Sequence, residues 1–408
     1  MKTHMKNKYF YFSFLIILLF LLYCKKLTVL DQGVIIPTPP DLPEFKRKYW
    51  PTDEWKSSTP EEQGMSSEAL QKMEEYAFQT TGLESERKGI RTDGIVIIRN
   101  GYLVYEKYAR GYSETSPHLL WSVSKSFANA LIGIAVRKGI LNIDDYAYKY
   151  FDIVPSETHK KIKIRHLLNM TSGLKSEEDY ETGPLFSTVI AMLYTRGRDD
   201  MANFGFQLPM RAEPGTFVYY SSCDTNILMS ILKTVAEEKD YGSFPWKELF
   251  DPIGMKNVSF EQDRSGTFIG SSYIYATHRD TAKFGFLYLN NGVWNGQKIL
   301  PDNWVKFSRT PSEGYQTTVP YPDMETSQYT AQWYSNFAIP DKNLSPPWPD
   351  APSDTFAALG HWGQIIFVIP SLDMVIVRTG DDREKVFSKN LFLKYIVESV
   401  TGENGVKK

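Results

Sequence analysis

The chain has 408 residues, of which 42% are hydrophobic and 23% are charged, as in an ordinary globular protein. This length can form one large domain or two small ones with a substantial core. The net charge of -2 excludes the basic surface that nucleic-acid binding requires. The two cysteines, Cys24 and Cys223, have no zinc-type spacing, and the histidines form no recognised cluster with acids, so we expect neither a metal nor another cofactor.

The first 24 residues have the pattern of an export signal. Three lysines in the first eight residues precede an apolar run from Tyr9 to Tyr23, and a basic segment followed by an apolar one is typical of such signals. The run is shorter than the roughly 20 residues that a membrane span needs. Because it ends in "LLYC", we expect a lipoprotein signal with Cys24 as the lipidation site; an uncleaved anchor is the alternative. Both predict an exported protein attached to the membrane at the cell envelope.

Residues 25–58 are predicted to be a linker. Five prolines fall between Val34 and Trp55, and proline-rich segments favour an extended spacer over packed structure. We therefore expect the globular domain to span residues 59–405.

The domain is expected to open with a helix and a β-hairpin. Thr59 is a candidate helix cap, with Pro60 at the first helical position and apolar residues at helical spacing behind it. Asn100-Gly101 then separates two runs rich in β-forming residues, and this dipeptide is typical of the tight turn of a hairpin.

The remainder of the chain divides into a helical part and a strand-rich part. Residues from about 140 to 275 are predicted to be mostly helix and loop. A second hairpin is expected around Pro370–Asp373, followed by a closing helix that Ser388 caps and Gly402 ends. Because strands lie towards both ends, we predict an α/β (α+β) fold. An antiparallel sheet from both termini would be flanked by helices, with the helical lobe inserted.

The segment "LLWSVSKSFANALIGIAVRKG" carries the strongest chemical signal. Ser122 and Lys125 are three residues apart and share one face of a helix, and the apolar residues behind them predict that this helix is buried. Burial lowers the pKa of a lysine and favours the free amine, which can accept the proton of a serine hydroxyl. The same spacing occurs from Ser85, Ser172 and Ser230, so a capped helix with an exposed lysine is the alternative interpretation.

Two later segments supply groups that would complete such a site. Tyr220 could share a proton with the amine and pass it to a leaving group; a packed core tyrosine is the alternative. His361 and Gly363 begin a predicted strand, where glycine would let a substrate lie close to the strand edge; a surface turn is the alternative. The N–H of Gln364 could join that of Ser122 in an oxyanion hole.

These segments resemble a known family. Ser122-Val-Ser-Lys125, Tyr220-Ser-Ser222 and "HWG" from His361 follow the order of the three motifs of serine β-lactamases and penicillin-binding proteins. Flanking phrases such as "IRHLLNMTSGL" resemble the class C-like branch, which includes esterases, D-amino-acid-specific peptidases and 6-aminohexanoate-dimer hydrolases. The resemblance covers about residues 59–402 and implies a β-lactamase-like fold.

The resemblance also implies roles for individual residues. Ser122 would be the acylated nucleophile, Lys125 its proton acceptor and Tyr220 a proton relay. The oxyanion N–H groups would come from Ser122 and Gln364. We therefore expect a serine hydrolase that cleaves an ester or amide of a small molecule or short oligomer.

Two positions differ from the family members that act on β-lactams. Ser222 stands where they have asparagine, and His361-Trp362-Gly363 stands where they have Lys-Thr-Gly. A largely neutral histidine gives little positive charge for an acidic substrate group at pH 7. A penicillin-binding or D-peptidase-type peptidoglycan enzyme and a non-catalytic binding module with the same fold are therefore alternatives to the esterase or amidase. A Ser–His–Asp α/β-hydrolase is disfavoured because no G-x-S-x-G occurs.

Besides Ser222 and the "HWG" motif, two groups of side chains are expected to contact substrate. Glu178 and Asp179 lie in the acidic segment "SGLKSEEDYETG", where they could form a cleft wall that favours substrates with a free ammonium group. Trp362 and Trp333 would supply an apolar wall opposite. The alternative for the acidic segment is a solvated loop.

Overall fold

The computed structural model describes residues 33–79, 82–181, 183, 186–319 and 328–401. The expected lipidation site Cys24 and the expected helix end at Gly402 lie outside these residues. The described residues from Ile36 onward belong to one unit, and the fold described below is the fold of that unit. None of its helices is long and apolar enough to cross a membrane.

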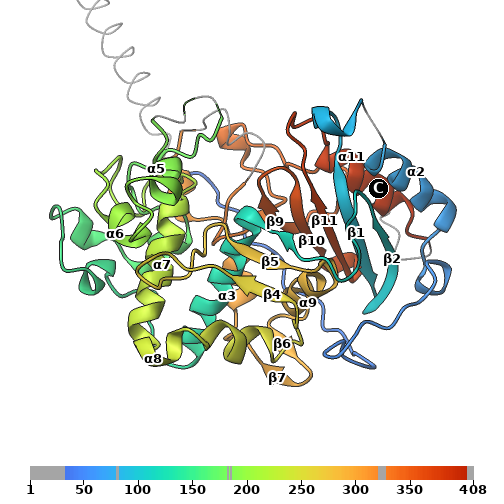
Figure 1. Ribbon diagram of the computed structural model, residues 1–408, viewed down its shortest axis with the longest axis horizontal. Coiled ribbons are helices and arrows are strands. Elements are labelled where there is room, and N and C mark those ends of the chain that lie inside the picture. Colours follow the sequence, from blue (N-terminus) through green and yellow to red (C-terminus); the bar gives the residue numbers. More distant parts are fainter. Residues whose placement is uncertain (1–32, 80–81, 182, 184–185, 320–327, 402–408) are drawn as a thin grey trace, which may run out of the picture. The chain divides into compact units, whose positions relative to one another are not determined.

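The described strands of the main sheet come from both ends of the chain. Their order is β2-β1-β11-β10-β9-β8, and every neighbouring pair is antiparallel. This arrangement confirms the predicted fold class (Figure 1). The strands are β1 Thr92–Arg99, β2 Tyr102–Tyr108, β8 Tyr334–Ser335, β9 Phe356–Gly360, β10 Gln364–Ile369 and β11 Met374–Gly380.

Both predicted hairpins are present. Asn100 and Gly101 join β1 to β2 with φ angles of 52° and 83°, in the left-handed region that Asn-Gly readily adopts. A short 3-10 turn, Pro370–Leu372, joins β10 to β11.

Helices cover both faces of this sheet because its strands are apolar on both sides. Ile95 and Ile97 face helices α2 and α11, whereas Val96 and Ile98 face α3 and α9, as the alternation of a β-strand requires. The helices are α2 Ser67–Ala77, α3 Ser124–Arg137, α4 Ile164–Leu168, α5 Thr188–Tyr194, α6 Met201–Phe206, α7 Ser222–Val235, α8 Glu238–Tyr241, α9 His278–Leu289, α10 Trp304–Arg309 and α11 Lys389–Glu398.

The middle of the chain forms the mostly helical part, from α4 to α8 (Figure 1). A small sheet of order β3-β5-β4 combines one strand from before α3 with two from after α8. The shorter strands are β3 His118–Leu119, β4 Val258–Phe260, β5 Ile274–Ala276, β6 Val293–Trp294 and β7 Gln297–Lys298.

Two expectations for the start of the domain need correction. The first long helix begins after Ser66, whose side chain accepts from Ala69 N. Thr59 instead lies before a 3-10 turn, Glu61–Gln63, whose N-cap is Pro60, and its Oγ1 accepts from Glu62 N. Residues 36–58 are also more than a free spacer. Arg47 donates to both carboxylate oxygens of Asp373 at 2.6 and 2.8 Å, and the buried Trp55 donates to the carbonyl of Arg279. Proline prevents regular structure here but does not prevent packing.

Helix α3 is the structural base of the site described next. Its residues from Ser124 to Ala135 are all buried, so it is enclosed on every side rather than amphipathic. Phe127 stacks on Phe284 of α9 with ring centroids 3.6 Å apart. A Cβ on Gly133 would lie 2.6 Å from the ring of Trp304, so only glycine fits at this contact. Close packing of this kind fixes the start of α3 rigidly.

Candidate active site

Ser122 lies in a single 3-10 turn, Trp121–Val123, immediately before α3. The backbone of the preceding Leu120 is fixed on two sides. Its N–H donates to the carbonyl of Ile274 at 2.9 Å, and a Cβ on Gly360 would lie 2.5 Å from its oxygen. Glycine therefore lets β9 approach the turn closely, and the sheet supports the backbone that carries Ser122.

Lys125 is 2% exposed and points back to Ser122. Its Nζ lies 3.0 Å from Ser122 Oγ, 3.0 Å from Ser222 Oγ and 2.9 Å from the carbonyl oxygen of Ser271. Burial lowers the pKa of Lys125 to about 8, against an opposing effect of the Glu178 charge. At pH 7 about one lysine in ten is then a free amine, far more than at an ordinary pKa.

Ser222 connects this lysine to Glu178. Its backbone N–H and its hydroxyl donate to the two carboxylate oxygens of Glu178 at 2.6 and 2.9 Å. Burial raises the pKa of Glu178, and the charge of Lys125 opposes that rise. Ser222 was expected to contact substrate; the structure puts it between Lys125 and Glu178.

Tyr220 lies against the same lysine. The Lys125 Nζ is 4.7 Å from the centre of its ring. Burial raises the pKa of the Tyr220 phenol well above its usual value, and a hydrogen bond with Ser122 opposes this. The ring also contacts that of Tyr329, with centroids 4.9 Å apart. Tyr220 is therefore within reach of both Ser122 and Lys125, as the resemblance implied.

Four aromatic rings surround the residue before Ser122. The rings of Tyr180, Tyr273, His361 and Trp362 lie 6.4, 6.1, 5.5 and 5.4 Å from that of Trp121 between centroids. Trp121 has a φ of 47°, which is costly for a side chain of this size and persists only when its surroundings enforce it. Burial lowers the pKa of His361 to about 4, so this ring is neutral at pH 7.

The "HWG" motif forms the turn between β9 and β10. Gly363 has a φ of 94°, and a Cβ there would lie 2.3 Å from Arg378. The side chain of Gln364 donates to the carbonyls of His361 and Gly380 at 3.0 and 2.7 Å, while its backbone begins β10 opposite Gly360. An oxyanion role for the Gln364 N–H stays a prediction.

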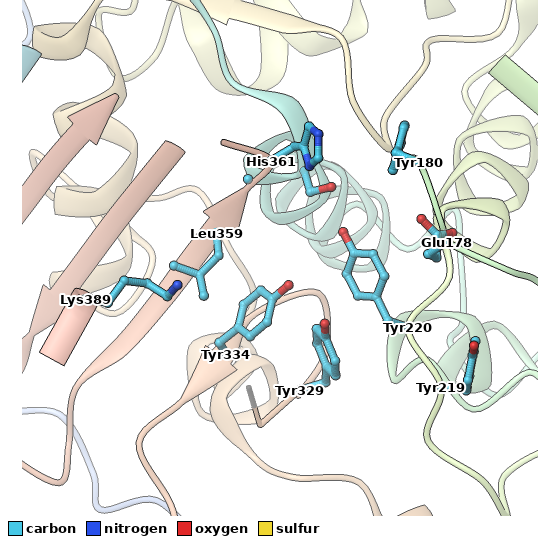
Figure 2. Close-up of a pocket in the computed structure, with 11 residues that line it drawn as sticks. Glu178, Tyr180, Tyr219, Tyr220, Tyr329, Tyr334, Leu359, His361 and Lys389 are labelled. Carbon is cyan, nitrogen blue, oxygen red and sulfur yellow. The ribbon is translucent and has the colours of Figure 1, made fainter. Parts of the chain in front are cut away.

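A cavity of about 290 Å³ opens beside Ser122. In Figure 2, Lys389 and Leu359 lie on one side of it and Glu178 and Tyr219 on the other. Its lining residues are Ser122, Glu178, Tyr180, Tyr219, Tyr220, Tyr329, Tyr334, Leu359, Gly360, His361 and Lys389. This size suits a short chain or a single ring.

Several expected wall residues are placed differently. Glu178 lines the cavity, but both of its oxygens already accept from Ser222. Asp179 is not among the lining residues, and Trp362 lines a neighbouring cavity instead. The expectation that Trp333 forms an apolar wall of the cleft was wrong. Its side chain faces away from the cavity, is completely buried and stacks on Phe284 in the core.

Sequence reasoning missed Tyr219, Tyr329, Tyr334, Leu359 and Lys389 as cavity residues. Tyr329, Tyr334 and Lys389 come from segments more than 200 residues after Ser122 in the chain, and no local pattern links them to it. Within the described part of the chain, no group of three or more His, Cys, Asp or Glu side chains is arranged to hold a metal ion.

Comparison with known proteins finds hydrolases of the same fold. The chain is 23% identical over 326 residues to the 6-aminohexanoate-dimer hydrolase of Paenarthrobacter ureafaciens, covering 76% of this chain and 78% of that protein. Two solved structures share the fold. EstCE1, a hydrolase with promiscuous acyltransferase activity, has a TM-score of 0.62 at 16% identity, covering 82% of this chain and 98% of that one. The D-stereospecific amidohydrolase from Streptomyces sp. has a TM-score of 0.57 at 14% identity, covering 81% and 98%.

The decisive match is to a family model. The model described as Beta-lactamase matches residues 71–387, a range that contains Ser122, Lys125, Tyr220 and His361. The resemblance seen in the three motifs is therefore confirmed, and the chain belongs to the Beta-lactamase family, whose fold it has; the relatives named above are hydrolases.

Proposed function

We propose that the protein is a serine hydrolase that cleaves an ester or amide bond through an acyl-enzyme on Ser122. The observation that carries the proposal is the 3.0 Å contact between Ser122 Oγ and the buried Lys125 Nζ. A lysine with a pKa of about 8 can act as a proton acceptor near neutral pH.

The hydrogen bonds of Lys125 support a definite direction for the proton. The carbonyl of Ser271 can only accept, so one N–H of the neutral amine points to it. Ser222 gives its own hydrogen to Glu178 and therefore accepts the second N–H. The remaining lone pair faces Ser122 Oγ, whose hydroxyl can donate to it. A neutral Lys125 is thus oriented as the base that a serine nucleophile needs.

The proposed reaction follows from this arrangement. Ser122 Oγ forms a bond to the substrate carbonyl carbon while its proton passes to Lys125. The resulting oxyanion would accept hydrogen bonds from the N–H groups of Ser122 and Gln364. When the bond to the leaving oxygen or nitrogen breaks, the proton returns to that atom through Lys125 and Tyr220. Water then attacks the acyl-enzyme by the reverse proton path, releasing the acid and restoring Ser122.

The relatives support an ester or amide rather than a β-lactam as substrate. One of them is a 6-aminohexanoate-dimer hydrolase and another a D-stereospecific amidohydrolase. In this chain His361 is neutral at pH 7, because burial lowers its pKa to about 4. It therefore lacks the fixed positive charge that Lys-Thr-Gly gives to β-lactam-active members.

The test is covalent labelling of the purified protein with a fluorophosphonate probe, with mass spectrometry to locate the adduct. We expect an adduct on Ser122 that Ser122→Ala abolishes. Ser230→Ala is the matched control, because Ser230 begins another Ser-x-x-Lys segment and should not affect labelling. Absence of labelling, together with no turnover of short esters, linear amides or D-peptides, would favour a non-catalytic binding module.

We also propose that the protein is exported and anchored through Cys24, on the evidence of the sequence alone. Cys24→Ala should abolish lipid labelling of the protein in cells. Persistent membrane fractionation of unlabelled protein would instead favour an uncleaved anchor.

A further inference from the structure

Lys389 lines the active-site cavity on the side away from Glu178. It is the first residue of α11, which Ser388 caps through its Oγ. Its side chain is half-buried and lies beside Tyr334 and Leu359, with the Nζ directed towards them (Figure 2). Among the residues that the structure describes, none accepts a hydrogen bond from this Nζ or forms an ion pair with it.

Three cations near Lys389 are paired. Arg378 contacts the carboxylate of Asp382 at 2.6 Å, Lys385 contacts Glu181 at 3.3 Å, and Arg383 contacts Asp381 at 2.7 Å. His361, the other basic side chain of the cavity wall, is neutral at pH 7 because its pKa is about 4. Lys389 is therefore the one unpaired positive charge among the described residues that line this cavity.

The location of Lys389 is unfavourable for a cation without a partner. A positive charge at the start of a helix opposes the helix dipole. Burial lowers the pKa of Lys389, and the charge of Arg378 lowers it further, while Asp382 acts in the opposite direction. An anion beside the Nζ would offset all three unfavourable effects.

The space around Lys389 can accept such an anion with a chain attached. Between Ser122 and Lys389 the cavity wall consists of Tyr329, Tyr334 and Leu359, which suits a short apolar chain. A second cavity of about 480 Å³ shares Lys389, Tyr329 and Leu359 with the first. The Nζ thus lies where two cavities meet and remains open to a ligand that enters from either.

We propose that Lys389 binds a carboxylate group of the substrate, so that the preferred substrates carry a negative charge a short apolar chain away from the scissile ester or amide. This inference rests on the proposed hydrolase function of Ser122. Lys389 would then determine specificity, while proton transfer would still depend on Lys125 and Tyr220.

The kinetic test compares charged and neutral esters of equal length. One pair is p-nitrophenyl hexanoate and the p-nitrophenyl monoester of adipic acid, which carries the charge on the acyl side. The other is the acetate esters of phenol and of 4-hydroxybenzoate, which carry it on the leaving group. In at least one pair we expect the ratio of kcat/KM, anionic over neutral, to fall about tenfold in Lys389→Met and in Lys389→Gln. Lys389→Arg should keep most of the ratio, and rising salt should reduce it in the wild type.

The matched control is Arg383→Met, which removes a positive charge from the same segment that is already paired with Asp381 and is not among the described residues that line either cavity. It should leave the ratio unchanged. Equal ratios in wild type and both Lys389 variants, for both ester pairs, would overturn the inference while leaving the hydrolase itself established.

A binding test separates this inference from the chemistry. Hexanoate and hexanamide are titrated calorimetrically into the Ser122→Ala protein, which cannot form an acyl-enzyme. We expect hexanoate to bind about tenfold more weakly when Lys389→Met is added, with hexanamide affected much less. If neither ester pair is hydrolysed but this difference persists, the proposed function fails and the carboxylate site stands. If hexanoate binding does not depend on Lys389, the site is refuted whatever the kinetics show.

Discussion

Helices α3 and α11 each have a lysine in their first turn near the cavity, yet the two lysines have opposite surroundings. Lys125 is enclosed and has three polar contacts, to Ser122, Ser222 and Ser271. Lys389 is half-buried at the cavity wall and has no partner among the described residues. The contrast teaches that a lysine is oriented for proton transfer by its neighbours, whereas a lysine that only supplies charge must leave room for a ligand.

The largest expected effect is at Lys125. Because a guanidinium does not give up its proton, Lys125→Arg should lose on the order of 10²-fold or more in kcat, nearly as much as Lys125→Ala. In the wild type, kcat/KM should rise with pH as the ammonium loses its proton, with a midpoint near the pKa of about 8. Steady-state kinetics from pH 6 to 9 measures both. Near-normal turnover in Lys125→Arg would remove the contrast between the two lysines.

Tyr220→Phe should have the next largest effect. It keeps the ring that lies 4.7 Å from the Lys125 Nζ but removes the hydroxyl that would relay the proton. We expect a loss of about 10²-fold in kcat, with KM changed much less. Tyr329→Phe is the matched control, since Tyr329 contacts Tyr220 in the same wall, and it should keep most of the activity. A Tyr220→Phe enzyme with full kcat would restrict proton transfer to Lys125.

Glu178→Gln should shift the pH profile rather than abolish activity. The Glu178 charge raises the pKa of Lys125, so removing it should lower that pKa below 8. The free amine then persists to lower pH, and the midpoint of kcat/KM moves to lower pH. The amide oxygen can still accept from the Ser222 N–H, whereas the amide nitrogen can only donate to the Ser222 hydroxyl, which donates to the carboxylate in the wild type. An unmoved midpoint would mean that Glu178 is already neutral in the free enzyme, since burial raises its own pKa.

The smallest effect is expected at Lys175, which repeats the spacing of Lys125 behind Ser172. Its side chain is exposed, and Ser172 donates to the buried Asp224 at 2.8 Å instead of contacting a lysine. Lys175→Met should change kcat/KM by less than about twofold, as for surface substitutions generally. A large loss of kcat/KM would show that an exposed lysine in a Ser-x-x-Lys segment also contributes to activity. That result would contradict the conclusion that the surroundings of a lysine decide its role.

Local patterns in the sequence predicted much of the fold. The Asn100-Gly101 turn, the hairpin around Pro370 and the cap at Ser388 each depend on a few adjacent residues. Their geometry therefore follows from turn and cap chemistry alone. Predicting the composition of the sheet required one further assumption, namely that the strand pairs near the two ends of the chain belong to one sheet.

The site was predictable only in part. Ser122 and Lys125 are three residues apart, in the turn before α3 and in its first turn, and the resemblance supplied Tyr220 and His361. Lys389 was missed because its position in the cavity depends on how α11 packs against the sheet. Trp333 was assigned to the wrong place, since a sequence shows that an aromatic residue is present but not which side of a loop it faces.

The wholly buried helix α3 also bears on how the protein is made. Its cover comes from β9 and α9, and the central strand β1 pairs with β11, so Ile97 lies opposite Ile376. Contacts this distant in sequence form slowly and only after the chain is nearly complete. A nascent chain that already contains Ser122 and Lys125 still lacks β9, β10 and α11. It should therefore lack a complete candidate site until synthesis ends, so the proposed reactivity of Ser122 would appear only in the finished chain.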